Sequence, residues 1–150
     1  MNHIIAIASD HAGFELKQFV LQYLEANGYT AHDFGTYTAD CCDYPDYAHP
    51  LAEAIEAGRF ACGIALCGSG NGINMTLNKH QGIRAAICWN RILATQAREH
   101  NDANVLVLPA RFIDRETTKE ILDAFLSADF MEGRHRKRID KIPVTCSGHG

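Results

Sequence analysis

The sequence has no apolar run that approaches the roughly 20 residues needed to span a bilayer. No cationic stretch precedes the short apolar run that begins at Ile4, so the N-terminus lacks the pattern of a secretory signal peptide. No low-complexity tract, internal repeat or domain linker interrupts the chain. We therefore expect a cytoplasmic protein without a membrane partner, folded as a single domain over residues 1–150.

Neither sign of charge dominates the sequence. Lysine and arginine number 14, and aspartate and glutamate number 18, which gives a formal net charge of −4. A net negative charge disfavours non-specific binding of nucleic acid, so we expect no nucleic-acid partner. With 47% hydrophobic and 21% charged residues, the composition is that of a globular protein with one sizeable core.

The six cysteines include no Cys-x-x-Cys pair, which is the spacing typical of zinc and redox sites. Cys62, Cys67 and Cys88 lie within or at the ends of apolar runs, where a reduced thiol packs as a small hydrophobic side chain. The eight histidines form no His-x-x-x-His pair on a helix with a third ligand nearby. We therefore predict reduced cysteines and no metal site.

Short apolar runs alternate with segments of helical periodicity along the chain. The runs are continuous rather than alternating, which favours parallel strands covered on both faces. The predicted fold is a three-layer α/β/α, Rossmann-like domain with a parallel sheet of about five strands. Strands are predicted at residues 4–8, 29–34, 61–66, 83–88 and 105–108, helices at about 11–27, 46–57, 72–82, 92–100 and 117–126, and a basic helix or tail from about 133.

A glycine-rich turn follows the third predicted strand and opens the next helix: Cys67-Gly68-Ser69-Gly70-Asn71-Gly72. The glycines allow the backbone to come close to a ligand, and several amide N–H groups converge where the helix dipole favours negative charge. The same field is expected to stabilise the thiolate of Cys67, which is a competent base or nucleophile. The segment therefore predicts a bound anion next to a reactive group.

Two nucleotide-binding loops do not fit this turn. Its spacing is Gly-x-Gly-x-Gly rather than Gly-x-Gly-x-x-Gly, it follows the third predicted strand, and no acidic residue ends the next strand. The chain also has no Gly-Lys-Ser/Thr sequence, which a Walker loop requires. These mismatches disfavour both a dinucleotide site and a Walker-type phosphate loop.

Ligands of a parallel α/β sheet bind beyond the carboxyl ends of its strands. Four polar residues closely follow predicted strands and are expected at this edge: Asp10, His11, Tyr44 and Arg111. His100 and Asn101 instead precede the fifth predicted strand and are expected at the opposite edge. They would have to reach the site from below or serve the site of another subunit.

Each candidate also has a purely structural interpretation. Asp10 can cap a helix, Tyr44 can pack in a turn, and His100 can complement a helix dipole. The basic run at 134–138 can be a solvated face, although Arg134 and Arg138 share a helical face that suits a phosphate. The glycine-rich turn is the hardest to explain structurally, because its glycines cost helix stability.

Several segments form a characteristic set when they are taken together: Ser9-Asp10-His11-Ala12-Gly13, Asp43-Tyr44-Pro45, Cys67-Gly68-Ser69-Gly70-Asn71-Gly72, Asn78-Lys79 before Gly82-Ile83-Arg84-Ala85, His100-Asn101-Asp102-Ala103-Asn104 and Gly133-Arg134-His135. This set resembles the type B ribose-5-phosphate isomerases, a family that also contains the galactose-6-phosphate isomerase subunits. The resemblance runs from about residue 3 to residue 142 with the motifs in the same order, whereas residues 145–150 carry no recognisable signal.

The resemblance implies interconversion of ribose 5-phosphate and ribulose 5-phosphate without a metal or organic cofactor. Cys67 matches the family's base, which moves a proton between C1 and C2 through an enediolate. His100 matches the acid that opens the sugar ring, with Asp10 as a helper, and Ser69 with the amides of the glycine-rich turn matches the groups that hold the oxyanion. The implied substrate contacts are Asp10, His11, Tyr44, Gly68, Ser69, Gly70, Asn71, Gly72, Asn101, Arg111, Arg134 and Arg138.

Some family members use a glutamate further along the loop as the base, but Ile73-Asn74-Met75 offers no acid here, which favours Cys67. The resemblance also implies a homodimer, with a tetramer left open, in which both subunits build each sugar-phosphate site. Two alternatives stay open: an isomerase of allose 6-phosphate or galactose 6-phosphate, and a non-catalytic sugar-phosphate-binding protein. The joint presence of Cys67, Ser69 and His100 favours an enzyme, since a binder needs the arginines but not the base.

Overall fold

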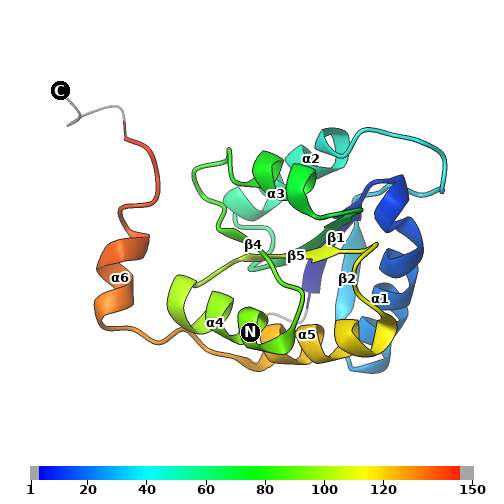
Figure 1. Ribbon diagram of the computed structural model, residues 1–150. Coiled ribbons are helices and arrows are strands. Elements are labelled where there is room, and N and C mark those ends of the chain that lie inside the picture. The colour runs from blue at the N-terminus through cyan, green and yellow to red at the C-terminus, as the bar shows by residue number, and fades with distance from the viewer. Residues whose placement is uncertain (1–3, 146–150) are drawn as a thin grey trace.

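Parallel strands form one sheet in the computed structural model, which describes residues 4–145 (Figure 1). Residues 1–3 and the tail at 146–150 lie outside the described part of the chain. The strands are β1 (Ile4–Ser9), β2 (Thr30–Asp33), β3 (Gly63–Cys67), β4 (Ala85–Ile87) and β5 (Val105–Pro109). The helices are the 3-10 turn η1 (His11–Gly13), α1 (Phe14–Ala26), α2 (Pro45–Glu56), α3 (Asn71–Leu77), α4 (Arg91–Asn101), α5 (Arg115–Ser127) and α6 (Arg134–Ile139).

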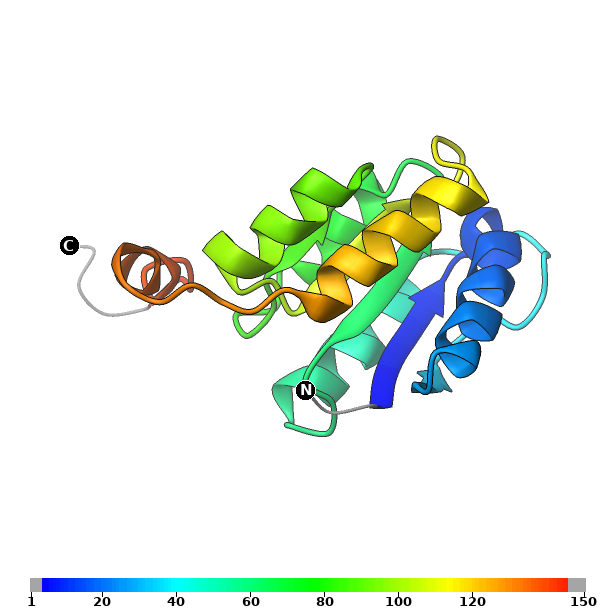
Figure 2. The same ribbon diagram turned by 90° about the horizontal axis from the view of Figure 1, so that it is seen from below.

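Helices cover both faces of the sheet, whose strand order is β2-β1-β3-β5-β4. All neighbouring strands are parallel. Helices α1, α5 and α4 lie side by side across one face (Figure 2), and α2 and α3 pack on the other. The predicted three-layer, Rossmann-like α/β/α fold is thereby confirmed.

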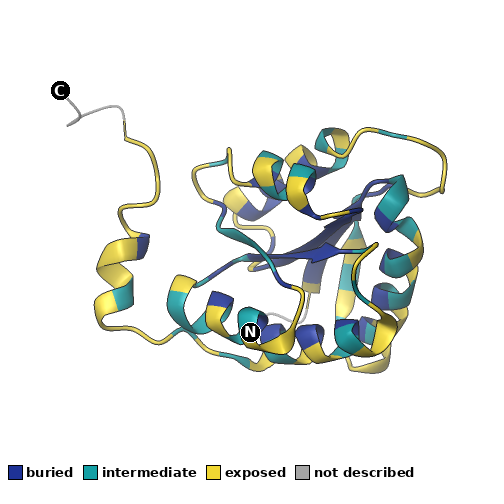
Figure 3. Ribbon diagram, viewed as in Figure 1, coloured by how far each residue is buried: buried dark blue, intermediate teal, exposed yellow. Residues whose placement is uncertain are grey.

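The central strand β3 shows why both faces need cover. Ile64 and Leu66 pack against the layer of α1, α4 and α5, whereas Ala65 and Cys67 face α2 and α3. Side chains alternate between the two faces of a strand, so an apolar run with no polar position requires a helical layer on each side. Figure 3 shows β1, β3 and β5 at the buried centre of the molecule, whereas the edge strands β2 and β4 are partly exposed.

Two predicted elements are shorter than their apolar patterns indicate. Helix α3 stops at Leu77 instead of continuing towards Gly82, and β4 covers only three of the residues predicted at 83–88. The cause is side-chain hydrogen bonding to backbone. The Asn78 amide accepts from the N–H of Ala85 at 2.8 Å and donates to its carbonyl at 2.9 Å, while Asn104 Oδ1 accepts the N–H of Arg84 at 2.7 Å. At these positions a side-chain amide takes the place of a backbone hydrogen-bond partner from a helix or a strand.

Three helix starts among residues 4–145 carry a side-chain cap. Asp10 accepts the N–H of Gly13 at 3.1 Å, Asn90 accepts that of Leu93 at 2.9 Å, and the Asp114 carboxylate caps α5. Helix α2 begins at Pro45, whose fixed φ suits the first position of a helix.

Helix α6 stands apart from the sheet and lies beyond the end of α4 (Figures 1 and 3). Most of its side chains are exposed, and Ile139 is its one buried residue. No helix among residues 4–145 is long and apolar enough to cross a membrane. Within the same residues the cysteines are free thiols, and Cys62, Cys67 and Cys88 are buried as predicted.

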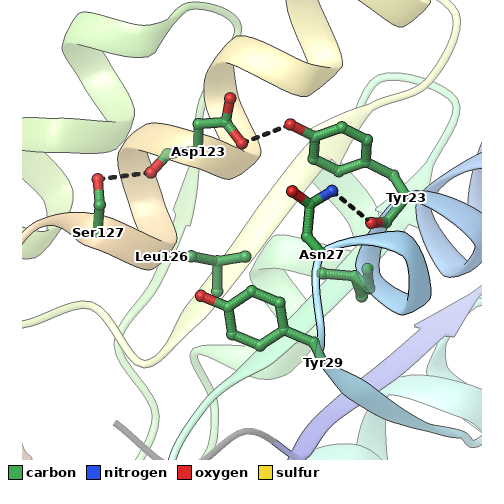
Figure 4. A pocket seen from close by; sticks show the side chains of 7 residues that line it. Tyr23, Asn27, Tyr29, Asp123, Leu126 and Ser127 are labelled. Carbon is green, nitrogen blue, oxygen red and sulfur yellow. Dashed lines mark hydrogen bonds between the residues drawn. The ribbon is translucent and has the colours of Figure 1, made fainter.

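A hollow of about 340 Å³ lies where α1 and α5 end, at the amino edge of the sheet (Figure 4). Across it the Tyr23 hydroxyl donates to Asp123 at 2.6 Å. This hydrogen bond raises the pKa of Tyr23 to about 12, and burial and the carboxylate charge act in the same direction. The hollow lies at the opposite end of the strands from the predicted ligand site, so we treat it as part of the α1–α5 contact.

Replacing Tyr23 with Phe removes this hydrogen bond and is expected to lower the free energy of unfolding at neutral pH. The loss should be only about 0.5–1 kcal/mol, because the bond is exposed to solvent. The folded-state pKa of Tyr23 lies above its ordinary value of 10.0, so the contribution is complete below pH 10 and is lost as the pH rises through about 12. Urea titrations over this range measure the difference between wild type and Tyr23→Phe. Ser127→Ala, which removes a neutral hydrogen bond from the same helix, is the control without pH dependence. A Tyr23→Phe difference that persists unchanged at pH 12 would contradict this account.

Candidate active site

The sheet changes direction of winding between β1 and β3. From β1 the chain moves to β2 at one edge of the sheet. It then returns to β3, beside β1, and continues to β4 at the opposite edge and to β5 between β3 and β4. Ser9 pairs in register with Leu66, and Cys67 pairs with Pro109. The carboxyl ends of these strands therefore meet at one edge, at the switch point where open α/β sheets bind ligands.

Cys67 is the last residue of β3 and is 4% exposed. Its carbonyl accepts the N–H of Ala110 at 3.0 Å, and the preceding carbonyl of Leu66 accepts the N–H of Asp10 at 3.3 Å. Backbone bonds on both sides thus hold the thiol between the loops that follow β1 and β5.

The glycine-rich turn leads from Cys67 into α3 through a residue with a left-handed backbone conformation. Gly70 has φ of +82°, and a Cβ there would lie 3.2 Å from Val107 Cγ1. A side chain would be strained in both conformation and space, which explains the glycine. Ser69 and Asn71 are exposed, and the Ser69 hydroxyl oxygen accepts the N–H of Asn71 at 3.2 Å. One amide of the predicted anion nest therefore already has a partner within the turn.

Tyr44 brings the segment before α2 onto this turn. A Cβ built on Gly72 would overlap the phenol ring of Tyr44, so the absence of a side chain at Gly72 is what allows the ring to lie there. Tyr44 is still 36% exposed. Its hydroxyl is consequently placed beside the turn and open to a ligand.

Asp10 and His11 come directly after β1. Asp10 is 6% exposed, and one of its oxygens caps η1, as its structural interpretation proposed. His11 Nδ1 accepts the backbone N–H of Cys42 at 3.2 Å, and the Cys42 Sγ lies 4.0 Å from the same nitrogen. Because Nδ1 acts as the acceptor, the proton of the neutral ring lies on Nε2.

Arg111 closes the same edge from the loop after β5. Its N–H donates to the carbonyl of Gly68 at 3.0 Å, and its guanidinium lies across that glycine, where a Cβ would be 3.1 Å from Nη1. The edge thus collects a first cluster, which we call the Cys67 cluster: Asp10, His11, Tyr44, Cys67, Gly68, Ser69, Gly70, Asn71, Gly72 and Arg111.

The remaining predicted residues form a second cluster at the other end of the molecule, here called the His100 cluster: His100, Asn101, Arg134 and Arg138. Helix α4 runs back along the sheet and ends at Asn101. The His100 ring stacks on that of His135 in α6, with ring centres 4.7 Å apart and planes 13° apart. The stack brings the basic helix α6 next to the end of α4.

Positive charge gathers around this stack. Partial burial lowers the pKa of His135 below its ordinary value, and the charges of His100, Arg134 and Arg138 act in the same direction. Arg134 and Arg138 are exposed and one helical turn apart. Among the described residues no carboxylate forms an ion pair with Arg134 or Arg138, and two such donors suit an anion such as a phosphate.

An ion-pair network that the sequence analysis missed fixes the end of α4. Asp102 adopts a left-handed conformation with φ of +46° and pairs with Arg84 at 3.3 Å and Arg98 at 3.0 Å. The Arg84 side chain also donates to the carbonyls of Asn101 and Asp102. The sequence feature that pointed to this network was the polar run after His100, which contains more hydrogen-bond acceptors than the end of a helix needs.

A single chain does not bring the two clusters together. The Cys67 cluster lies at the carboxyl end of β5, and the His100 cluster lies before its amino end. Five residues of strand separate these ends, which at about 3.3 Å per residue is about 15 Å. This agrees with the prediction that His100 and Asn101 lie at the opposite edge.

A doubly wound sheet with a thiol, a carboxylate and a glycine-rich turn at its switch point defines the class of α/β proteins that bind small anionic ligands. Residues 5–142 match the ribose/galactose isomerase family. The chain belongs to this family. It is 47% identical over 143 residues to the probable ribose-5-phosphate isomerase B of Mycoplasma pneumoniae, which covers 95% of this chain and 94% of that protein.

Among solved structures, the chain is likewise similar to ribose-5-phosphate isomerases. A ribose 5-phosphate isomerase from Thermotoga maritima has a TM-score of 0.92 at 48% identity, covering 93% of this chain and 97% of the other. The ribose-5-phosphate isomerase B of Mycoplasma genitalium, solved with bound ribulose-5-phosphate, has a TM-score of 0.87 at 40% identity and covers 93% of both chains.

Proposed function

We propose that this chain is a ribose-5-phosphate isomerase, which interconverts D-ribose 5-phosphate and D-ribulose 5-phosphate in the cytoplasm. The observation that carries the proposal is the position of Cys67. A nearly buried thiol ends β3 at the switch point, beside Asp10 and the glycine-rich turn. The relative that was solved with ribulose-5-phosphate supports the same substrate class.

The reaction balances without an added oxidant or reductant. In the open-chain sugar, the Cys67 thiolate removes the proton from C2, and the electrons of that bond form an enediolate with the carbonyl at C1. Moving the hydroxyl proton from O2 to O1 and returning the abstracted proton from Cys67 to C1 then gives the ketose, with its carbonyl at C2. The Ser69 hydroxyl, whose oxygen also accepts the N–H of Asn71, and the amides at Gly68, Gly70 and Gly72 stabilise the oxyanion that develops between these steps.

Ring opening comes before this transfer and needs an acid for the ring oxygen. We assign that role to His100, with Asp10 as a helper. The hydroxyl of Tyr44, the amide of Asn101 and the Nε2–H of His11 are suited to the sugar hydroxyls or phosphate. Binding of the phosphate by cations holds the reacting carbons against the base, and the cations assigned to it are Arg111, Arg134 and Arg138.

These assignments require two copies of the chain in each site. The Cys67 and His100 clusters lie at opposite ends of β5, too far apart for one small sugar. We propose a homodimer in which one protomer supplies the Cys67 cluster and its partner supplies the His100 cluster. A two-fold axis makes two such sites at once.

Exposed apolar side chains near the edge strand β4 are consistent with a partner there. Trp89 and Ile92 follow β4 and are 57% and 59% exposed, and Met75 on the neighbouring helix α3 is 65% exposed. Exposed large apolar side chains are typical of interfaces.

The first prediction from this proposal concerns turnover and the base. Wild-type protein should isomerise ribose 5-phosphate with a higher kcat/KM than allose 6-phosphate or galactose 6-phosphate in a coupled assay. Cys67→Ala should lower kcat at least about a hundredfold, because it removes the group that transfers the proton. The fold should survive, since the lost Sγ leaves only a small cavity.

Cys62→Ala is a matched control at the other end of the same strand. Cys62 is also 4% exposed, and burial raises the pKa of its thiol. This variant should keep wild-type turnover while losing comparable packing. Retention of more than a few per cent of wild-type kcat by Cys67→Ala would exclude Cys67 as the base.

The second prediction tests the shared site. Cys67→Ala and His100→Ala chains, each inactive alone, are mixed, denatured and refolded. In a heterodimer both defects fall in one site and the other site is intact. Random pairing makes about half of the dimers heterodimers, so about a quarter of wild-type activity should return. Verified heterodimers without activity would show that the two residues act from one chain.

A further inference from the structure

Lys17 is fully buried, although lysine is normally exposed. It lies on α1 in line with Val20 and Leu24, the other buried residues of that helix. A lysine on the apolar stripe of a helix was visible in the sequence, and it is the signal of a supporting residue that the sequence analysis missed.

The Lys17 ammonium joins three segments. It donates to Asp33 Oδ1 at the end of β2, at 2.6 Å, and to the carbonyl of Thr36. The rings of Phe14 and Tyr37 flank it at 5.8 and 5.5 Å. Burial lowers the pKa of Lys17, and the hydrogen bond and charge of Asp33 oppose that shift.

The segment that Lys17 holds is bound in turn to β1, just before Asp10. Asp33 Oδ1 also accepts the N–H of Gly35 at 2.9 Å. The carbonyl of Gly35 accepts the N–H of Ser9 at 2.7 Å, and the N–H of Thr36 donates to the carbonyl of Ser9 at 2.7 Å. Lys17 therefore fixes the place where the loop of residues 35–44 leaves the sheet.

The same loop carries two contacts to the Cys67 cluster. The N–H of Cys42 donates to His11 Nδ1, and Tyr44 lies against Gly72. We therefore expect a shift at Gly35 and Thr36 to release the His11 ring and to disturb Tyr44, although the carbonyl of Tyr44 is also bonded to the first turn of α2. Cys67 itself is held independently, because its strand pairs with β1 and β5.

We propose that Lys17 is a positioning residue that acts through the loop of residues 35–44 to place Tyr44 and His11 for substrate binding. A methionine of similar length would fill the same space without a buried charge, so packing alone does not account for a lysine here. The directional bonds to Asp33 and Thr36 are what an apolar side chain cannot supply. The inference about substrate rests on the proposed function.

The test is Lys17→Met, with Lys119→Met as the matched control. Lys119 pairs with Glu116 at 3.2 Å on α5, and both side chains are exposed. Lys17→Met should raise KM for ribose 5-phosphate about tenfold or more and change kcat less than about threefold, because binding contacts move and the base does not. Lys119→Met should leave both constants unchanged.

Asp33→Asn gives a second variant in case Lys17→Met does not fold. It weakens the same junction at a side chain that is 24% exposed. The double variant should be no worse than the more impaired single variant, because both changes break one connection. A double variant whose losses add in full, or a Lys17→Met protein with wild-type KM, would overturn the proposal.

Amide hydrogen exchange separates this proposal from the proposed function. In Lys17→Met the backbone N–H of Cys42 should exchange at least about tenfold faster, while amides of β3 and β5 keep their rates. This readout needs no substrate. If wild type fails to turn over ribose 5-phosphate, the proposed function falls while exchange still tests the loop. Unchanged exchange at Cys42 would refute the positioning role.

Discussion

The parallel pairing of β1, β3 and β5 is the constraint on which the rest of the structure depends. In-register pairing places Ser9 beside Leu66 and Cys67 beside Pro109, so three loops leave the sheet at one edge. The apolar runs that make this pairing stable also require helices on both faces, and those helices return the chain to the opposite edge. Burial of the parallel sheet therefore determines both where the Cys67 cluster lies and how far it is from the His100 cluster.

The two ends of the molecule carry different chemical groups. The carboxyl edge has a thiol, a carboxylate and a glycine-rich turn, which suit proton transfer and oxyanion binding. The end of α4 with α6 has histidines and arginines, which suit an acid and a phosphate. Separate contacts support the two groups. The hydrogen bonds of Lys17 hold the loop that contacts the Cys67 cluster, and the ion pairs of Asp102 hold the end of α4 beside the His100 cluster. A two-fold partner is the simplest way to combine complementary halves that one chain keeps apart.

The sequence predicted the layers and the carboxyl-edge residues well, because strand order along the chain and continuous apolar runs carry that information. It located His100 at the opposite edge for the same reason. It could not predict where α3 ends and where β4 begins, since Asn78 and Asn104 bond to the backbone there through contacts that form only after folding. The burial of Lys17 and the stack of His100 on His135 likewise depend on packing between segments far apart in the sequence. Periodicity alone does not encode such contacts.

The central claim is that each site joins the Cys67 cluster of one chain to the His100 cluster of another. A crystal structure of the protein with ribulose 5-phosphate bound measures this most directly. The account predicts C1 and C2 of the sugar next to Cys67 of one protomer, and the phosphate between Arg134 and Arg138 of its partner. A sugar phosphate whose contacts all come from a single chain would contradict it.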